Sequence, residues 1–431
     1  MKVLVVGNGG REHALAWSLL QSATVQQVFC TPGNGGTATL AGCKNLPFAV
    51  TDFGSIATFA QTEGIGLVVV GPEVPLAAGI TNSLQAAGLT VFGPTQEGAL
   101  IESSKAWAKA LMQEAGIPTA RAAAFENRQE AIAYLSLQAL PIVIKADGLA
   151  AGKGVTVAQT MDEAQAAVNA AFDGEFGEAG NRVLIEEFLQ GQEVSVLAVT
   201  DGLTLRPLLP AQDHKQIGDG DQGANTGGMG AYAPTPIVGD RLMARIVAEV
   251  LEPTIACLRD RGIDYRGVLY AGLMITPAGE PKVVEFNCRF GDPETQVVLP
   301  LLETPLDQLL LACTHQRLAE FPDLQWKRGT SACVVLAAPG YPGHYPKGAP
   351  ITGLAAAAAA GAIVFHAGTR LDEAQVLTDG GRVLGVTAID QTFEGAIAQA
   401  YAAIPAIHFD GMYYRRDIGH RILPTRLQPK P

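Results

Sequence analysis

The chain has 431 residues, 48% of them hydrophobic and 17% charged, which is enough for several domains with full apolar cores. Its formal net charge of −12 at pH 7 excludes a general nucleic-acid-binding protein, because such proteins need a basic surface to displace counterions from phosphates. The six cysteines lack C-x-x-C spacing and histidine partners at zinc spacing, which favours buried thiols in a reducing cytoplasm. An uncharged run at 348–365 contains Pro350 and is a poor membrane span, so no membrane partner is expected.

Residues 1–100 alternate short apolar strands with helices, as in VLVV followed by EHALAWSLLQ, and LVVVGPE followed by LAAGITNSLQAAG. Apolar strands separated by helices indicate a parallel α/β sheet that is covered on both faces. Ligands of such sheets gather at the carboxyl ends of the strands. We therefore expect the loops GNGGR, TPGNGG and GPEVPL to lie on one rim.

The first glycine-rich turn, VVGNGGREHA at residues 5–14, departs from a dinucleotide-binding fingerprint. Glu12 occupies the position of the third glycine, and the next strand ends at Thr31 where an acidic residue would hold an adenosine ribose. These departures disfavour an NAD-dependent dehydrogenase. Backbone N–H groups at a helix N-terminus, with Arg11 beside them, suit a terminal monophosphate instead. A structural turn with a solvated arginine is the alternative.

A helix is predicted over SSKAWAKALMQEAG, residues 103–116, followed by a hairpin made of PIVIKA, DGLAAGKG and VTVAQ. The turn DGLAAGKG is not a Walker loop, because only three residues separate its bracketing glycines and a glycine follows its lysine. It is suited to close over phosphates as a flap, with Lys145 pointing at the same phosphates. A lysine at the end of a strand is otherwise usually a surface residue.

In VLIEEFLQGQE, residues 183–193, the adjacent Glu186 and Glu187 must point to opposite faces of a strand, so one of them faces inward or lines a cleft. Glu193 is placed to hold the hydroxyls of a ribose. A pair of solvent-facing glutamates is the alternative. Further on, the polar loop AQDHKQIGDGDQGANTGGMGAYAPTP spans 211–236, and a loop of this length without structure of its own is usually functional.

The segment VVEFNCRFGDPETQ, residues 283–296, carries the strongest local signal. Glu285 and Asn287 lie two apart on a predicted strand and share one face, while Phe286 and Cys288 point to the other. Two oxygen ligands on one face suit Mg²⁺, which also binds water and nucleotide phosphates. Arg289 can clamp a carboxylate or a developing phosphate. Beyond residue 328, the strands SACVVLAA, AIVFHAG and RVLGVTA and the helix EGAIAQAYAAI predict a final α+β unit.

These motifs, in this order, resemble the phosphoribosylamine–glycine ligase (glycinamide ribonucleotide synthetase) family of ATP-grasp enzymes. The resemblance covers nearly the whole chain, and DHK…NTGGMGAYAP and RFGDPETQ are its most discriminating parts. It implies an α/β and α+β multidomain fold with an N-terminal parallel α/β domain, a two-lobed ATP-grasp domain and a C-terminal α+β domain. The expected bounds are 1–100 for the substrate-phosphate domain, about 120–192 and 193–327 for the lobes within an ATP-grasp domain at 101–327, and 328–431 for the last domain.

The resemblance also implies a reaction, in which ATP drives the ligation of glycine to 5-phosphoribosylamine through glycyl phosphate. The products are glycinamide ribonucleotide, ADP and phosphate, as in de novo purine biosynthesis. Mg²⁺ or Mn²⁺ is the implied cofactor, and the partners are these small molecules, with no nucleic acid or membrane. A cytoplasmic monomer is expected. Other ATP-grasp carboxylate ligases lack the DHK…NTGGMG loop, and a non-catalytic nucleotide sensor would lose Glu285, Asn287 or Arg289.

Residue roles follow from the same resemblance. The implied ATP-binding residues are Lys105, Lys145, Gly152, Lys153, Gly154, Glu186, Glu187, Phe188 and Glu193. The implied substrate-binding residues are Gly9, Gly10, Arg11, Glu73, Asp213, Lys215, Asn225, Thr226, Gly227 and Arg289. The implied catalytic residues are Arg289, Lys145, Asp213 and Lys215. Glu285 and Asn287 are the implied metal ligands, and the preceding strand LYAGLMIT offers no third carboxylate.

Overall fold

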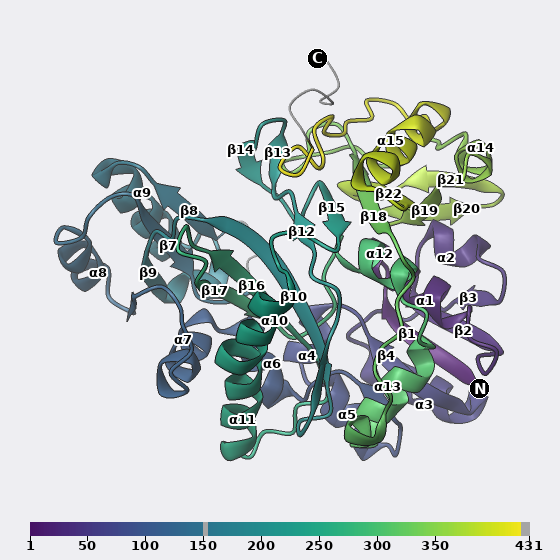
Figure 1. Ribbon diagram of the computed structural model, residues 1–431, viewed down its shortest axis with the longest axis horizontal. Helices are drawn as coiled ribbons and strands as arrows, with labels where there is room; N and C mark the ends of the chain where they lie inside the picture. Colours follow the sequence, from purple (N-terminus) through teal and green to yellow (C-terminus); the bar gives the residue numbers. More distant parts are fainter. Residues whose placement is uncertain (150–153, 424–431) are drawn as a thin grey trace.

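The computed structural model describes residues 1–149 and 154–423, and Figure 1 shows how their elements are arranged. Within these residues the strands form four sheets of four or five strands and two separate two-stranded hairpins. None of the described helices is long and apolar enough to cross a membrane.

Five parallel strands form the N-terminal sheet, in the order β3-β2-β1-β4-β5. The strands are β1 (Lys2–Gly7), β2 (Gln27–Pro32), β3 (Cys43–Asn45), β4 (Ile65–Val70) and β5 (Val91–Phe92). The helices are α1 (Gly10–Leu19), α2 (Gly35–Thr39), α3 (Phe53–Glu63), α4 (Glu73–Ala77), α5 (Ile80–Ala86) and α6 (Gln96–Ser103). Alternate residues of β1 enter two different cores, Leu4 and Val6 one and Val3 and Val5 the other. The predicted parallel sheet with two covered faces is therefore confirmed.

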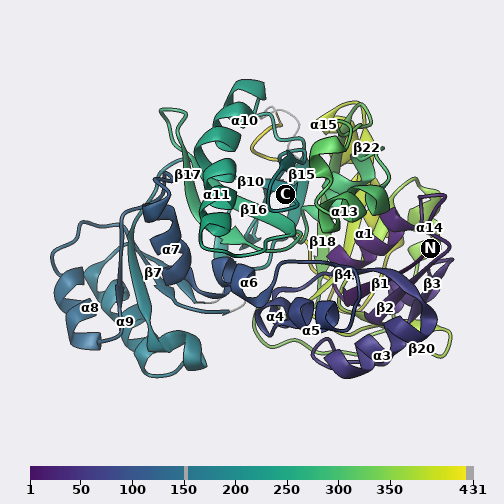
Figure 2. The same cartoon turned by 90° about the horizontal axis from the view of Figure 1, so that it is seen from below.

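A small lobe follows helix α7 (Lys105–Glu114) and stands apart at one end of the molecule (Figure 2). Its antiparallel sheet has the order β6-β9-β7-β8. The lobe contains β6 (Ala122–Phe125), α8 (Arg128–Leu135), β7 (Ile142–Ala146), β8 (Val155–Ala158), α9 (Met161–Phe172), a 3-10 helix at Gly177–Asn181 and β9 (Val183–Glu187). The predicted hairpin is confirmed, since Lys145 of β7 pairs with Val155 of β8. The two helices and one face of the sheet enclose a core of their own.

A second antiparallel sheet has the order β11-β10-β16-β17. Its strands are β10 (Gln192–Thr200), β11 (Leu205–Pro207), β16 (Gly267–Ile275) and β17 (Pro281–Asn287). One face is covered by a continuous helical segment made of α10 (Asp240–Ile246), a π-helical turn at Val247–Leu251 and α11 (Glu252–Asp260). Successive residues of a strand point to opposite faces, so Leu197, Val199 and Val268 pack into a second core on the other face, and polar side chains occupy the rest of that face.

The last sheet, in the order β12-β15-β18-β22-β19, combines strands from both sides of residue 328. The segment 211–236, expected to lack structure of its own, folds into β12 (Gln212–Asp213), β13 (Gln216–Gly218), β14 (Gln222–Asn225) and β15 (Gly230–Ala233). That expectation is wrong because β15 finds a partner far along the chain, β18 (Thr330–Ala337), with Gly230 opposite Val334. The remaining elements are α12 (Thr295–Val298), α13 (Leu306–Thr314), α14 (Leu354–Ala359), β19 (Ile363–His366), β20 (Thr369–Asp372), β21 (Gln375–Thr378), β22 (Arg382–Asp390), α15 (Phe393–Ala403) and 3-10 turns at Leu299–Leu301, Leu318–Glu320 and Ile404–Ala406.

Candidate active site

The face of the β10-β16-β17 sheet opposite α10 and α11 places several polar side chains in one row. The strand register sets Tyr270 of β16 opposite Asn287 of β17, and Gly272 opposite both Glu285 and, on the other side, Ser195 of β10. Glu285 and Asn287 therefore share a face, while their neighbour Phe286 is buried in the core on the helix side. The predicted alternation along residues 285–288 is confirmed, whereas a β-bulge before Glu285 places Val283 in the same core as Phe286. This arrangement leaves a strip of oxygen-bearing side chains for ligands.

Two lysines and a glutamate meet between the small lobe and this sheet. Lys145 Nζ lies 2.9 Å from Glu186 Oε2, and Lys109 Nζ lies 3.3 Å from Glu186 Oε1. All three side chains are almost fully buried, and Lys145 also donates to the carbonyl oxygen of Val284 at 3.1 Å. Glu186 is thus the inward-facing member of the glutamate pair. The sequence argument missed Lys109, although it lies one helical turn after Lys105.

The start of helix α7 is tied to the beginning of the glycine-rich turn. Lys105 Nζ donates to the carbonyl oxygen of Gly148 at 2.7 Å, and the Asp147 carboxylate accepts from the backbone N–H of Ala106 at 3.1 Å. Burial lowers the pKa of Lys105, and Glu285 opposes that shift, so the two residues lie within electrostatic reach of each other. Gly152 and Lys153 of the expected ATP site lie outside the described residues.

The other residues of the expected ATP site surround this point. Gly154 accepts a hydrogen bond from the backbone N–H of Ala146 at 2.8 Å, which closes the hairpin. Glu187 faces away from Glu186 and pairs with the exposed Arg121, with 2.8 Å between Oε2 and Nε. Phe188, directly after β9, is 37% exposed, so its ring does not take part in the apolar core. Its position at the exit from the small lobe leaves its backbone groups near the junction of the lobes.

Arg289 joins the end of the β17 strip to the N-terminal domain. Its guanidinium lies 2.8 Å from Glu102 Oε1 and 3.3 Å from Glu73 Oε2, and it donates to Asn287 Oδ1 at 3.2 Å. Burial alone would lower the pKa of Arg289, but the carboxylates of Glu102 and Glu73 raise it above its usual value. Burial raises the pKa of Glu102 despite this arginine. Glu102, which the sequence argument missed, is held in turn by the backbone N–H of Cys288 at 2.8 Å.

The N-terminal glycine turn is closed by its own glutamate. Glu12 accepts a hydrogen bond from the backbone N–H of Gly9 and forms an ion pair with Arg11. A Cβ atom on Gly7 would approach the Glu12 side chain to 2.5 Å, so this side chain fills the space beside β1. Arg11 Nη1 also donates to the carbonyl oxygen of Phe290 at 3.1 Å. The guanidinium predicted to bind a phosphate therefore lies at the junction with the 283–296 segment.

The helix after this turn is also anchored across domains. The backbone N–H of Arg11 donates to Asp292 Oδ2 at 3.3 Å, and a Cβ atom on Gly10 would meet the Gln296 amide at 2.5 Å. Although burial opposes the shift, Arg289 and Arg11 hold the pKa of Glu73 below its usual value. Arg11, Glu73 and Arg289, three of the residues predicted to bind substrate, are thus within electrostatic reach of one another.

Asp213, Lys215 and Glu193 form a second charged cluster. Lys215 Nζ lies 2.9 Å from Glu193 Oε2 and 3.2 Å from Asp213 Oδ1. Burial alone would lower the pKa of Lys215, but the two carboxylates raise it well above its usual value. Lys215 lowers the pKa of Glu193, whereas burial raises the pKa of Asp213 to about 6. The cluster therefore combines a firmly charged lysine with a carboxyl group that titrates close to neutral pH.

Beside this cluster lies a buried carboxylate that the sequence argument named only as part of a turn. Glu294 Oε1 accepts from the hydroxyl of Tyr270 at 2.6 Å and from that of Ser195 at 3.0 Å. Burial, with Glu294 as the next contribution, raises the pKa of Tyr270 well above its usual value, which keeps its proton on the hydroxyl. Only the strand register places these hydroxyls beside Glu294. No spacing in the sequence signals that contact.

The remaining predicted substrate residues follow Lys215 around the β13–β14 hairpin. Thr226 Oγ1 donates to the carbonyl oxygen of Lys215 at 2.7 Å, and Asn225 lies opposite Gln216 in the hairpin. The carbonyl oxygen of Gly227 accepts from Arg382 Nη1 at 2.6 Å. Arg382 also donates to the carbonyl oxygen of Asp292 at 2.7 Å. It therefore links the C-terminal part of the chain to the site, which no motif indicated.

The strip on β17 offers the donors that a hard divalent cation prefers. In the ranges 1–149 and 154–423 no side chain hydrogen-bonds the carboxylate of Glu285, and Asn287 contributes an amide oxygen. No group of three or more His, Cys, Asp or Glu residues in those ranges is arranged to hold a metal ion. Glu285 and Asn287 thus fit a magnesium-like ion whose other ligands are phosphate and water, and do not fit a closed protein cage.

Family models and known proteins agree with this organisation. Residues 1–102 match the phosphoribosylglycinamide synthetase N domain, 103–295 its ATP-grasp (A) domain and 331–421 its C domain. The chain is 66% identical over 423 residues to the phosphoribosylamine–glycine ligase of Nostoc sp., covering 98% of this chain and 100% of the relative. Identity to the phosphoribosylamine–glycine ligase of Escherichia coli is 50% over 425 residues, covering 98% and 99%. The crystal structure of phosphoribosylamine–glycine ligase from Thermotoga maritima aligns with a TM-score of 0.83 at 33% identity, covering 97% of this chain and 100% of that chain.

Proposed function

The chain belongs to the phosphoribosylglycinamide synthetase family, and from that premise we propose that it ligates glycine to 5-phosphoribosylamine with ATP, giving glycinamide ribonucleotide, ADP and phosphate. The observation that carries the proposal is the position of Arg289. Its ion pairs with Glu73 and Glu102 join the rim of the N-terminal sheet to the strip on β17. A phosphorylated amine bound at the rim then lies beside the place where a carboxylate is activated.

ATP binds between the small lobe and the β17 strip in this proposal. Lys145 and Lys105 contact its phosphates, and buried Glu186 orients Lys145. Glu187 and the backbone of Phe188 line the adenine side, and Glu193 accepts from the ribose hydroxyls. Such a layout excludes water from the reacting phosphate, which protects an activated intermediate from hydrolysis.

The reaction proceeds by two displacements. An oxygen of the glycine carboxylate attacks the γ-phosphorus of ATP, the bond to the bridging oxygen breaks, and ADP leaves behind glycyl phosphate. The amine nitrogen of phosphoribosylamine then attacks the carbonyl carbon, the carbon–oxygen bond to phosphate breaks, and the amide forms. Because the acyl phosphate is already activated, no protein nucleophile is required.

The chain's own charged groups accompany these displacements. Arg289 and Lys145 neutralise negative charge as it moves between oxygens. The Asp213 carboxylate accepts the proton that the attacking amine loses, since its pKa of about 6 is close to neutral pH, and Lys215 holds its orientation. Gly9, Gly10 and Arg11 hold the ribose 5-phosphate, Glu73 holds the ribose, and the Asn225–Gly227 loop lies beside glycine.

Glu285 and Asn287 would hold a divalent cation together with the nucleotide phosphates, and Mg²⁺ or Mn²⁺ would supply charge neutralisation on the transferred phosphoryl group. A carboxylate and an amide on one face of a strand are the ligand types such a cation prefers. We assign the enzyme to the cytoplasm, as a monomer. The cysteines, all buried and free, fit a reducing compartment.

The proposal is tested by ADP release in parallel reactions. One contains ATP, glycine and phosphoribosylamine made in place from ribose 5-phosphate and ammonia, and the others lack glycine or ribose 5-phosphate. ADP should accumulate only in the complete mixture, with glycinamide ribonucleotide formed in equal amount. ADP release that does not depend on either component would contradict the assignment.

A further inference from the structure

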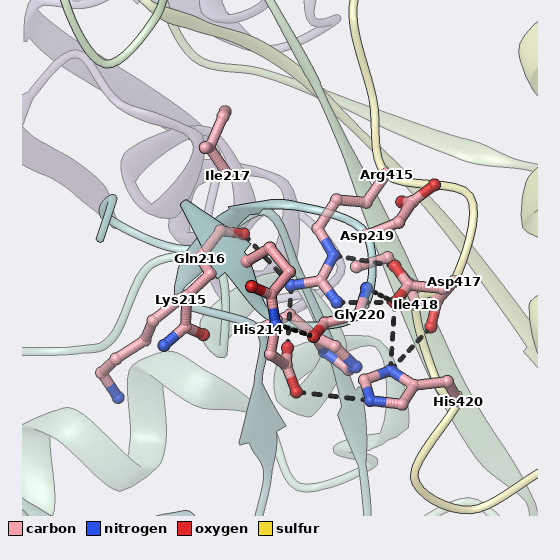
Figure 3. Close-up of polar contacts among 12 residues, drawn as sticks. His214, Lys215, Gln216, Ile217, Asp219, Gly220, Arg415, Asp417, Ile418 and His420 are labelled. Carbon is pink, nitrogen blue, oxygen red and sulfur yellow. Dashed lines mark hydrogen bonds and ion pairs between the residues drawn. The ribbon is translucent and has the colours of Figure 1, made fainter. Parts of the chain in front are cut away.

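The segment 413–421 runs alongside the β13–β14 hairpin and contacts it almost residue by residue (Figure 3). Tyr413 donates through its hydroxyl to the carbonyl oxygen of Ile217 at 2.9 Å. The backbone N–H of Arg416 donates to Asp219 Oδ1 at 2.8 Å, and that of Gly220 donates to Asp417 Oδ2 at 2.7 Å. Both sides of the hairpin turn are therefore fixed by a part of the chain some 200 residues away in sequence.

Arg415 forms the centre of this contact and is fully buried. Its Nη1 donates to the carbonyl oxygen of Gln216 at 3.1 Å and to Asp221 Oδ1 at 2.9 Å. Its other nitrogens, Nε and Nη2, donate to the two oxygens of Asp417, both at 2.8 Å. A planar guanidinium that satisfies a backbone carbonyl and two carboxylates fixes their relative orientation more strictly than a lysine can.

Arg421 and His420 complete the network from the same segment. Arg421 Nη2 donates to Asp221 Oδ2 at 2.8 Å, and its Nη1 donates to the carbonyl oxygen of Asp213 at 3.1 Å. His420 Nε2 lies 3.3 Å from Asp221 Oδ2. Asp221 thus has two arginines and a histidine as partners at once. Its backbone lies in the left-handed region at φ 56°, which aspartate and asparagine adopt more readily than other side chains.

The two ends of the hairpin carry the groups assigned to catalysis. Asp213 and Lys215 precede β13, and Thr226, which follows β14, donates twice to the carbonyl oxygen of Lys215. The backbone N–H of Gly419 also donates to His214 Nε2 at 3.2 Å, between those two residues. Any displacement of the hairpin therefore moves the Lys215 ammonium relative to its partners Glu193 and Asp213.

We propose that the segment 413–421 is a positioning element for Lys215 and Asp213, with Arg415, Arg421 and Asp221 as its positioning residues. None of the three needs to contact substrate. They hold the hairpin so that the Lys215–Asp213 pair lies beside the reacting amine and acyl groups. This inference rests on the proposed function, because it assigns the pair to the glycine and amine side of that reaction.

The test compares Asp221→Asn and Arg421→Gln with Arg416→Gln. Asparagine tolerates the left-handed backbone of position 221, and Arg416 is exposed in the same segment, so its variant removes the same positive charge as Arg421→Gln. We expect kcat to fall on the order of 10- to 100-fold in the first two variants, since small displacements of reacting groups have effects of that size. KM for ATP should change less than about twofold, because ATP is held mainly by the small lobe. Hydrogen exchange of residues 214–226 should rise, with exchange in the small lobe unchanged.

Two outcomes overturn the inference. One is normal kcat in Asp221→Asn and Arg421→Gln although exchange in the hairpin has risen, which would make the hairpin position irrelevant to turnover. The other is an equal loss in Arg416→Gln, which would reduce the effect to overall charge. Wild-type protein that shows no glycine-dependent ADP release contradicts the proposed function instead. The two failures are therefore distinguishable.

Discussion

The small lobe and the region around Arg289 hold their charged side chains in different ways. In the small lobe, Glu186 pairs with Lys145 of the lobe and with Lys109 of the preceding helix α7, and the lobe has an apolar core of its own. Around Arg289, side chains from the N-terminal sheet, the β10-β16-β17 sheet and the C-terminal sheet meet over a shared apolar core. A unit with its own core can move as a body, whereas a junction of three regions cannot. We call the small lobe the movable side and the region around Arg289 the fixed side. We expect nucleotide entry to involve the movable side and substrate alignment to involve the fixed side.

The largest effect is expected where the two sides meet, in Glu285→Ala. Removing this carboxylate should lower kcat by about 1,000-fold or more, because it takes away the charged ligand of the proposed cation. ADP release measured over a range of Mg²⁺ concentrations checks this, with the exposed Glu280→Ala as control. Activity that is retained in this variant at every Mg²⁺ concentration would move the metal site elsewhere.

Glu186→Gln should lower the stability of the movable side alone. It leaves two buried lysines without a counter-charge, which costs about 3 kcal/mol or more. The neighbouring Glu187→Gln removes a more exposed pair with Arg121 and should cost less than about 1 kcal/mol. Urea unfolding of both variants measures the difference, and equal losses would refute the buried triangle as the source of the stability.

Arg11→Ala should affect the fixed side alone. Loss of the guanidinium should raise KM for phosphoribosylamine by about tenfold or more while KM for ATP stays nearly unchanged. Steady-state kinetics with each substrate varied in turn provides the measurement, and Lys44→Ala, an exposed change in the same sheet, is the control. Equal weakening of both substrates would contradict the phosphate role of this turn.

The smallest effect concerns pH. Burial lowers the pKa of His13 to about 3 and that of His366 to about 4, and the two meet where α1 contacts β19. Their folded pKa values lie below the unfolded value near 6.5, so the native state binds fewer protons and loses stability as pH falls from about 6.5 towards 4. We expect about 1 kcal/mol per histidine between pH 7 and 5.5.

Unfolding experiments at several pH values, repeated with His13→Asn, check this expectation. The stretch 101–190 contains no histidine, so the small lobe should lack this dependence. A variant whose pH dependence equals that of the wild type would show that His13 does not contribute. If stability falls at low pH only in the fixed side, the two sides differ in the way that we expect.

The sequence was sufficient for elements whose residues lie close together along the chain. The parallel N-terminal sheet, the Lys145 hairpin and the shared face of Glu285 and Asn287 all follow from local periodicity, and the structure confirms them. The family and its reaction followed from nearly full-length motifs. Each of these inferences used spacing within one element.

Contacts between distant elements could not be predicted from spacing within one element. Lys109 was missed because an extra lysine on a helix is usually a solvent-facing residue. Glu102, Tyr270 and Arg382 acquire their significance only through partners that lie up to about 187 residues away in the chain. The strands in the segment 211–236 were missed for the same reason. Strand β15 pairs with β18, about 100 residues later, and a four-residue strand is too short to show a periodic pattern in the sequence.

The pairing of β15 with β18 limits how this chain can be divided. A gene fragment that ended at residue 327 would expose one edge of β15, with backbone donors and acceptors that have no partner, and such edges promote aggregation. By contrast, the small lobe closes its own sheet over its own core. Recombination between related genes would therefore preserve folding when the breakpoints flank the small lobe, and would disrupt it when they separate 211–236 from the C-terminal sheet.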